Sequence, residues 1–159
     1  MNSLTQARVK ELYVAPAAGA LMQSVERVDV SPTGIVGDRY GEGIGRFTHA
    51  KRRTIRHVSL IAIEAVAAAN QQLEVPFLLS ETRRNIVTEG IKLNELIGVE
   101  FQIGGVGLRG VELCTPCRVP STLSGKANFL QAFEGRGGLR AEVIMPGAIC
   151  LHDAIMVRD

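Results

Sequence analysis

Long hydrophobic runs are missing from this sequence. No uninterrupted apolar stretch in its 159 residues reaches the ~18 residues that a membrane-spanning helix needs. The N-terminal segment MNSLTQARVKEL contains no apolar core of the kind found in signal peptides. Hydrophobic residues make up 46% and charged residues 21%, the balance of an ordinary globular protein. We therefore expect a cytoplasmic protein without a membrane partner, folded as a single domain over residues 1–159.

The net charge is also small. Lysine and arginine total 18 against 16 for aspartate and glutamate, which leaves a net charge of +2. Such a balance does not favour a nucleic-acid partner, and we expect none. The positive charge gathers in the segment KRRTIRH at 51–57. A charge run of this kind is typical of a solvated loop.

Cysteines are few, and their pattern does not complete a metal site. Three cysteines without an export signal predict free thiols in a reducing compartment. Cys114 and Cys117 form a C-x-x-C pair in LCTPC, whereas Cys150 stands alone. A structural zinc site needs four ligands, but no second pair is present and the three histidines are isolated. We therefore expect no structural zinc.

Other roles for the C-x-x-C pair remain. A redox pair would start a helix, but RVPSTLSG after the second cysteine has little helical character in its first turn. Pro116 should end the preceding strand, which leaves Cys117 on a loop beside Arg118, whose charge favours a reactive thiolate. Free cysteines are also commonly small buried hydrophobic residues. The local pattern leaves the last two alternatives open.

Strand patterns dominate the chain. Residues 8–15, 24–30 and 54–61 alternate between apolar and polar side chains, and further short apolar runs follow towards the C-terminus. Helical patterns cover 60–73 and 122–135, and glycine or proline separates most of the runs. We predict a mainly β fold with a few inserted helices and a barrel-like core, since regular β/α alternation is absent.

Arginines recur beside predicted turns, in GIVGDRY, ETRRNIV and GRGGLRAEV. Consecutive glycines can direct several backbone N–H groups to one point, and arginines add bidentate donors for an anion. The G-K-[ST] ending of a P-loop is missing. These features predict a pocket for a phosphorylated or otherwise anionic ligand. Its predicted residues are Arg39, Arg83, Arg84, Asn85, Arg136, Gly137, Gly138 and Arg140.

Several motifs occur together in an order that resembles a known family. They are GIVGDRY, ETRRNIVTEGIKLNELIG, FQIG, LCTPC, GRGGLRAEV and HDAIMV. Their order and spacing resemble the MOSC domain, which is named for the C-terminal part of molybdenum cofactor sulfurase. The resemblance runs from about residue 8 to the end. One departure is His152, where the family usually has glycine, and the additional domains of the larger relatives do not fit in this chain.

The resemblance implies a barrel similar to the β-barrel domain of pyruvate kinase. It also implies a cysteine that carries sulfur or ligates molybdenum, assigned here to Cys117 with Cys114 as its lesser neighbour. Basic residues would hold the phosphate of molybdenum cofactor (molybdopterin), and pyridoxal phosphate is a further association of the family. The implied activity is sulfur transfer or molybdenum-dependent reduction, with a sulfur-donor or reductase protein as partner. The alternative is a non-catalytic binding module for a phosphorylated ligand, with structural cysteines.

We further expect the guanidinium groups to meet in one cavity. Arg136, Arg140 and at least one of Arg83 and Arg84 should point into the same cavity as the CTPC loop. Their shared position next to turns and the family resemblance motivate this expectation.

Overall fold

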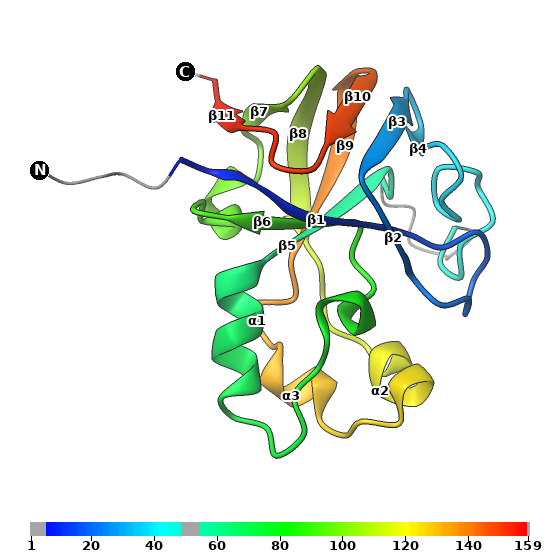
Figure 1. Cartoon of the computed structure of the whole chain (residues 1–159), viewed down its shortest axis with the longest axis vertical. Coiled ribbons are helices and arrows are strands. Elements are labelled where there is room, and N and C mark those ends of the chain that lie inside the picture. Colours follow the sequence, from blue (N-terminus) through cyan, green and yellow to red (C-terminus); the bar gives the residue numbers. More distant parts are fainter. Residues whose placement is uncertain (1–5, 49–54, 159) are drawn as a thin grey trace, which may run out of the picture.

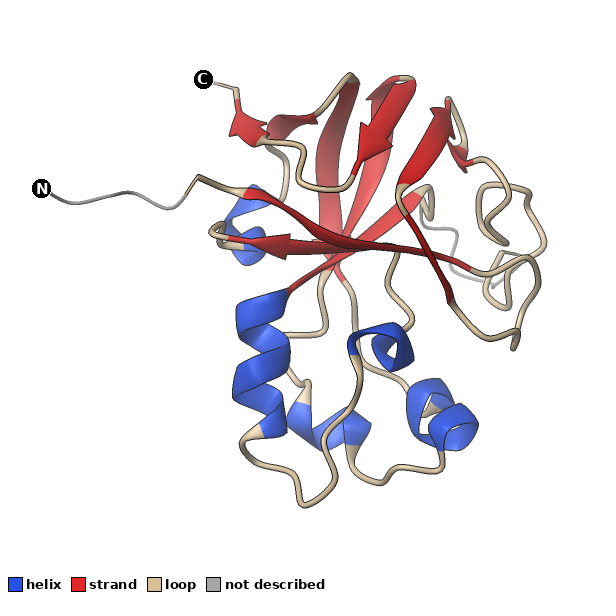
Figure 2. Cartoon of the chain, in the orientation of Figure 1, coloured by secondary structure: helices blue, strands red, loops and turns tan. Residues whose placement is uncertain are grey.

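The computed structural model describes residues 6–48 and 55–158. Its strands are β1 (Arg8–Val14), β2 (Gln23–Val25), β3 (Arg27–Ser31), β4 (Gly34–Ile35), β5 (Val58–Ala62), β6 (Ile86–Glu89), β7 (Glu100–Ile103), β8 (Val106–Leu113), β9 (Leu139–Met145), β10 (Gly147–Cys150) and β11 (Ile155–Val157). Its helices are α1 (Ile63–Asn70), α2 (Val119–Ser124) and α3 (Phe129–Ala132), with the short 3-10 helices η1 (Leu79–Thr82) and η2 (Leu93–Leu96). Figure 2 shows the strands in one half of the molecule and most helices in the other. The predicted mainly β fold with a few inserted helices is confirmed.

The strands form two β-sheets. The larger has the strand order β11-β7-β8-β9-β5-β6-β1-β2, and the smaller has the order β10-β3-β4. Neighbouring strands are antiparallel except β5 and β6, which are parallel. A parallel pair needs a long connection, which α1 and the loop after it supply (Figure 1). Both strands therefore begin at the same edge of the sheet, where residues 55–57 and 83–85 lead into them.

The β5–β6 pair is buried on both faces. Leu60 and Ile86 belong to the main core between the strands, whereas Ile61 and Val87 belong to a second cluster under the helices. Three phenylalanine rings in edge-to-face and stacked contacts complete this second cluster: Phe77, Phe129 and Phe133. Full burial of one such side chain contributes roughly 1.5–3 kcal/mol. Burial on both faces explains why adjacent positions are apolar in each strand, at Leu60 and Ile61 in β5 and at Ile86 and Val87 in β6.

The helices differ from the predicted ranges. The expected helix at 60–73 begins only at Ile63, because the residues before it pair in β5. The expected helix at 122–135 is divided into α2 and α3, since Gly125 (φ 73°) and Asn128 (φ 71°) adopt left-handed conformations between them. The prediction of little helical character after Cys117 is wrong, because α2 begins at Val119. Proline is well tolerated in the first turn of a helix, where its missing N–H is not needed.

The two ends of the larger sheet approach each other at the start of β1. The N–H of Val9 donates to the carbonyl of Asp153 (2.9 Å), and the N–H of His152 donates back to Val9 (3.0 Å). A third bond joins the N–H of Ile155 to the carbonyl of Ala7 (2.9 Å). These bonds link the start of β1 and the residue before it to the start of β11 and the segment before it, and closure into a barrel stays a prediction.

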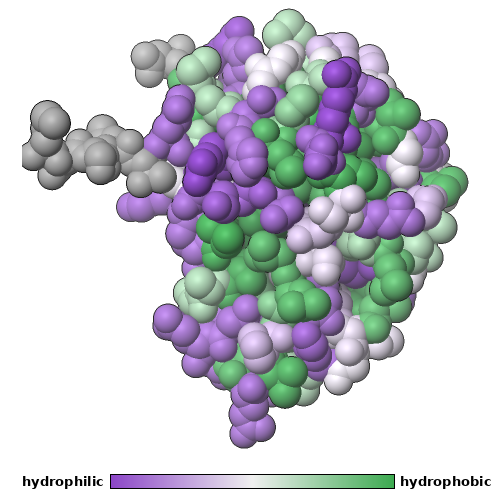
Figure 3. Space-filling model, in the orientation of Figure 1, coloured by the Kyte–Doolittle hydropathy of each residue, from purple (hydrophilic) through white to green (hydrophobic). Residues whose placement is uncertain are grey.

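Hydrophilic and hydrophobic residues are interspersed over the face of the molecule shown in Figure 3. None of the helices in the described part of the chain is long and apolar enough to cross a membrane.

Candidate functional site

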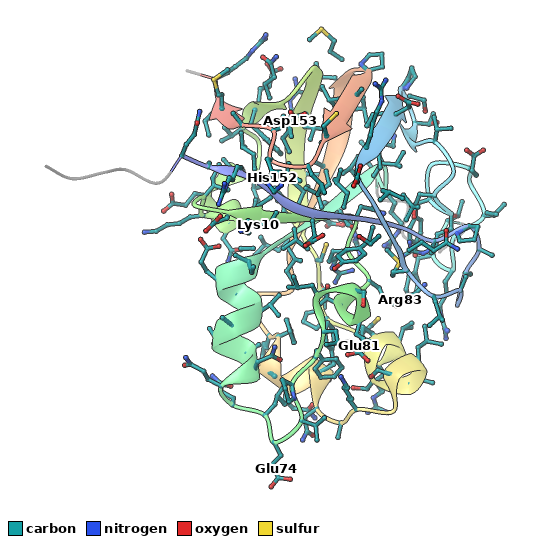
Figure 4. The ribbon with its side chains drawn as sticks, viewed as in Figure 1. Lys10, Glu74, Glu81, Arg83, His152 and Asp153 are labelled. Carbon is teal, nitrogen blue, oxygen red and sulfur yellow. The ribbon has the colours of Figure 1, made fainter. Side chains whose placement is uncertain are left out.

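A pocket of about 400 Å³ lies where β5 and β6 begin. The loop after β1, the turn after β4, the CTPC loop and α2 form its walls. Among the described residues, its lining includes six arginines and no aspartate or glutamate. These arginines are Arg39, Arg46, Arg56, Arg83, Arg84 and Arg140. We call this site the arginine pocket, and Figure 4 places Arg83 beside η1, between the sheet and α2.

A buried carboxylate, Asp38, lies against the part of the arginine pocket formed by Arg39 and Arg83, which we call the floor. Asp38 is fully buried and accepts hydrogen bonds from the backbone N–H groups of Ala15 (3.0 Å) and Tyr40 (3.2 Å). The same carboxylate pairs with Nη1 of Arg39 at 3.0 Å. The GDR motif therefore folds so that its aspartate ties the turn after β4 to the end of β1 and orients its arginine.

Arg83 completes the floor. Its side chain is almost as buried as that of Arg39, with residue exposures of 8% and 7%. Nη1 of Arg83 donates to the carbonyl of Ala20 (2.7 Å), and Nη2 of Arg39 donates to the carbonyl of Arg83 (3.2 Å). Burial and the charge of Arg39 lower the pKa of Arg83, while Tyr40, Asp38 and Cys117 act in the opposite direction. The floor therefore carries two buried guanidinium groups against one buried carboxylate.

The glycine-rich segment supports the CTPC loop. Nε of Arg84 donates to the carbonyl of Gly137 (2.8 Å), and the N–H of Cys114 donates to the carbonyl of Gly138 (2.7 Å). A Cβ atom added at Gly137 would lie 2.6 Å from the carbonyl oxygen of Cys114 and 3.2 Å from Cγ of Pro116. Glycine is therefore required here for the close approach of two backbone segments. Neither Gly137 nor Gly138 lines the arginine pocket, although both were predicted as parts of an anion nest.

Arg136 lies apart from the other predicted arginines. It lines a second pocket, between α1 and η2, together with Gly138. The expectation that Arg136 shares a cavity with the CTPC loop is wrong, whereas Arg83, Arg84 and Arg140 do line that cavity. The physical reason is the turn after α3, where the N–H of Arg136 donates to the carbonyl of Phe133 (3.0 Å). Arg140 follows within β9, on the pocket side.

Asn85 lines the pocket with a side chain that is already hydrogen bonded. Its Oδ1 accepts from the N–H (3.3 Å) and Oγ (3.1 Å) of Ser59, and its Nδ2 donates to the carbonyl of Tyr13 (3.1 Å). These bonds join β1, β5 and the start of β6. Asn85 thus positions the arginines that precede it.

The two cysteines of CTPC have different surroundings. Cys114 is 2% exposed, whereas Cys117 is partly exposed and lines the pocket. Both are free thiols, as is Cys150. The exposed Arg118 does not line the pocket, whereas Arg83 lines it together with Cys117.

The sequence interpretation missed Arg56. It was assigned to a solvated loop, but its guanidinium lies 5.2 Å from the centre of the Phe47 ring and its Nε is buried without a partner in the described structure. Burial and the charge of Arg140 lower its pKa. The alternation of TIRHVSLI, with Arg56 on the face of Val58 and Leu60, was the signal that could have identified it. The cationic residues at 51–53 lie outside the described ranges.

Three further lining features were not predicted: Arg46, the aromatic pair Tyr40 and Phe47, and the apolar residues of α2. In the described ranges, no group of three or more histidine, cysteine, aspartate or glutamate side chains is arranged to hold a metal ion. The absence of structural zinc stays a prediction.

Comparisons with known proteins identify a family and several structures of similar fold. The model of the MOSC domain family matches residues 47–156. The YuaD protein from Bacillus subtilis shares the fold with a TM-score of 0.81 at 21% identity, covering 96% of both chains. YiiM from Geobacillus stearothermophilus has a TM-score of 0.73 at 11% identity, covering 96% of this chain and 75% of that one. YiiM from Escherichia coli has a TM-score of 0.69 at 15% identity, covering 96% and 70%.

No curated protein matches this sequence. The solved structures show a likeness of fold, and the family model covers more than half of the sequence. The chain belongs to the MOSC domain family.

Proposed function

We propose that this protein binds a phosphorylated anionic ligand in the arginine pocket, and that this ligand is molybdenum cofactor or a related compound. The charge imbalance of the floor carries the proposal. Arg39 and Arg83 are both buried, and Asp38 is the single buried carboxylate beside them in the described structure. A buried charge without a counter-charge is strongly unfavourable, so an anion that enters the pocket is stabilised there.

The lining residues suit both the phosphate group and the metal of such a cofactor. Guanidinium groups bind phosphate through charge-assisted hydrogen bonds, and Arg39 and Arg83 would hold that group. Cys117 is the one sulfur-bearing residue among the described lining residues, and thiolate is a soft metal ligand. The volume of about 400 Å³ fits a small-molecule site. The cofactor, when bound, would supply the redox chemistry of its metal.

Cys117 would act as the sulfur carrier or as the molybdenum ligand. As a carrier, its thiolate attacks the outer sulfur of a donor persulfide, forms a new S–S bond and releases the donor thiolate. Atoms and electrons balance, and no oxidant is needed. The donor would be a persulfide-bearing protein, and a reductase protein would be the partner in a reductive reaction. Pro116, Val119 and Pro120 line the same pocket as Cys117 and give it apolar neighbours.

The alternative is a non-catalytic module that binds a phosphorylated ligand. Cys114 favours it, since a thiol with 2% exposure at the end of β8 packs as a small hydrophobic residue. The two functions share the arginine floor and differ in whether Cys117 takes part.

One experiment separates these functions. Wild type, Cys117→Ser and the control Cys150→Ser are purified from a molybdenum-replete host, their molybdenum content is measured, and each is melted with and without inorganic phosphate. We expect molybdenum in wild type and Cys150→Ser, loss of most of it in Cys117→Ser, and an equal rise in Tm with phosphate in all three. No molybdenum in any protein, with the phosphate effect intact, supports the binding module. No phosphate effect contradicts both functions.

A further inference from the structure

Four of the pocket arginines form two separate pairs. Arg39 and Arg83 make the floor pair, joined by the hydrogen bond from the first to the carbonyl of the second. Arg56 and Arg140 make a second pair, which we call the upper pair, from the segment before β5 and from β9. The charge of Arg140 acts on Arg56, just as that of Arg39 acts on Arg83. Each pair therefore brings two like charges together in one pocket.

Two aromatic residues connect the pairs. The guanidinium of Arg39 lies 4.9 Å from the centre of the Tyr40 ring, and Oη of Tyr40 accepts the N–H of Phe47 (3.4 Å). The guanidinium of Arg56 lies 5.2 Å from the centre of the Phe47 ring. The order of contacts is thus guanidinium, Tyr40, Phe47, guanidinium. This chain of contacts links the floor pair to the upper pair through Tyr40 and Phe47.

Each pair retains capacity for an anion. In the floor pair, the Asp38 carboxylate accepts hydrogen bonds from two backbone N–H groups as well as from Arg39, so it is not available to Arg39 alone. In the upper pair, Arg140 bonds to Glu112 through Nη1 (2.8 Å), whereas Nε of Arg56 is buried without a hydrogen-bond partner among the described residues. A buried donor without a partner costs free energy, which a ligand acceptor can recover.

We propose that the ligand of the arginine pocket carries two anionic groups, one bound by Arg39 and Arg83 and the other by Arg56 and Arg140, as in a diphosphate ester. This inference rests on the proposed function and specifies its ligand class. Asp38 and Glu112 each offset part of the charge of one pair, and a single phosphate of about −1.5 to −2 charges bound at the floor pair would leave Nε of Arg56 without an acceptor. Two anionic groups joined through a short bridge balance both.

The test compares inorganic phosphate, pyrophosphate and tripolyphosphate by calorimetric titration at one fixed ionic strength. The proteins are wild type, Arg56→Gln, Arg140→Gln and the control Arg136→Gln, whose side chain lines the other pocket. We expect the best polyphosphate to bind wild type at least about tenfold more tightly than phosphate. The two upper-pair variants should each lose about tenfold for that polyphosphate and less than about threefold for phosphate. The control should match wild type for all three probes.

Different contrary results would overturn different parts of the proposal. Equal affinity of wild type for phosphate and both polyphosphates would overturn the two-group ligand and leave the proposed function standing. So would an equal loss for phosphate and polyphosphate in Arg56→Gln and Arg140→Gln, because that pattern describes a single anion site. Absence of binding by all three probes overturns the proposed function itself. Circular dichroism of each variant verifies that it is folded.

Discussion

Nη2 of Arg39 donates a hydrogen bond to the backbone carbonyl of Arg83 over 3.2 Å, across 44 positions of sequence. The bond joins the turn after β4 to the segment that starts β6, and it holds two cationic side chains next to each other. Their repulsion is tolerated because Asp38 lies against Arg39 and because Arg83 donates to the carbonyl of Ala20. The stability of this floor therefore depends on one carboxylate.

Replacing that carboxylate should be strongly destabilising. Asp38→Asn leaves two buried guanidinium groups without a counter-charge, and we expect the free energy of unfolding to fall by about 3–5 kcal/mol. Urea denaturation followed by circular dichroism measures this change. The control is Asp29→Asn, since Asp29 pairs with Arg27 on an exposed surface and its loss should hardly move the urea midpoint. Equal midpoints for the two variants would contradict the importance of the buried pair.

The close approach of Gly137 to the CTPC loop gives a second prediction. In Gly137→Ala the added Cβ meets the carbonyl oxygen of Cys114 at 2.6 Å, so the loop must shift. We expect a loss of about 1–3 kcal/mol in unfolding free energy and an altered alkylation rate of Cys117. The control is Gly105→Ala, where the nearest atom to the new Cβ is 3.8 Å away. An unchanged thiol rate in a folded Gly137→Ala protein would show that this contact does not position the loop.

The cysteines should differ in reactivity. Cys117 lines the arginine pocket close to Arg83, whereas Cys114 is buried. With iodoacetamide we expect one thiol that reacts at least about tenfold faster than Cys150, a thiol that does not line the pocket. Cys117→Ser should abolish this fast phase, and Cys114→Ser should retain it. The opposite pattern reverses the assignment, and identical profiles for wild type and both variants make both sulfurs structural.

Stability should fall on mild acidification because of His57. Its Nδ1 accepts the N–H of Val143 (3.1 Å), and burial lowers its pKa below the ordinary 6.5, against the raising effect of Glu142. The unfolded chain therefore binds a proton more readily than the folded one. The stability that His57 contributes is complete above about pH 6.5 and is lost as the pH falls through the lower folded pKa.

Urea midpoints measured between pH 8 and pH 5 check this dependence. In His57→Asn, an amide oxygen can replace Nδ1 as acceptor but does not titrate, so the decrease below pH 6.5 should be smaller than in wild type. An equal decrease in both proteins would show that His57 is not its source.

Some of this site could be predicted from the sequence. Pro116 marks the end of β8, as expected, and the cysteine after it lies on the pocket wall. The arginines at 39, 83, 84 and 140 were identified by their positions next to turns, and the structure brings them together. Short patterns of this kind succeed because strand ends and turns are encoded locally.

Other parts of the site depend on tertiary packing. Arg136 and Arg140 are four positions apart in one glycine-rich motif but line different pockets. The direction in which the turn leaves α3 decides this, and no local pattern contains that direction. The role of Gly137 was misassigned for a similar reason, because its constraint comes from the backbone of Cys114, which is distant in sequence. The burial of the floor carboxylate, Asp38, could not be predicted locally either, because it requires the end of β1.

The parallel pairing of β5 with β6 also bears on the order of folding. Ser59 and Asn85, which lie at the starts of these strands, are 26 positions apart, and His57 bonds to Val143 across 86 positions. Chain segments this distant must lose considerable conformational entropy before they gain a contact, which slows their pairing. Each helix can form from local contacts, whereas the arginine pocket forms only when β5, β6 and β9 have met. During synthesis, the ability to bind an anion should therefore arise only after the last of these strands, β9, has been made.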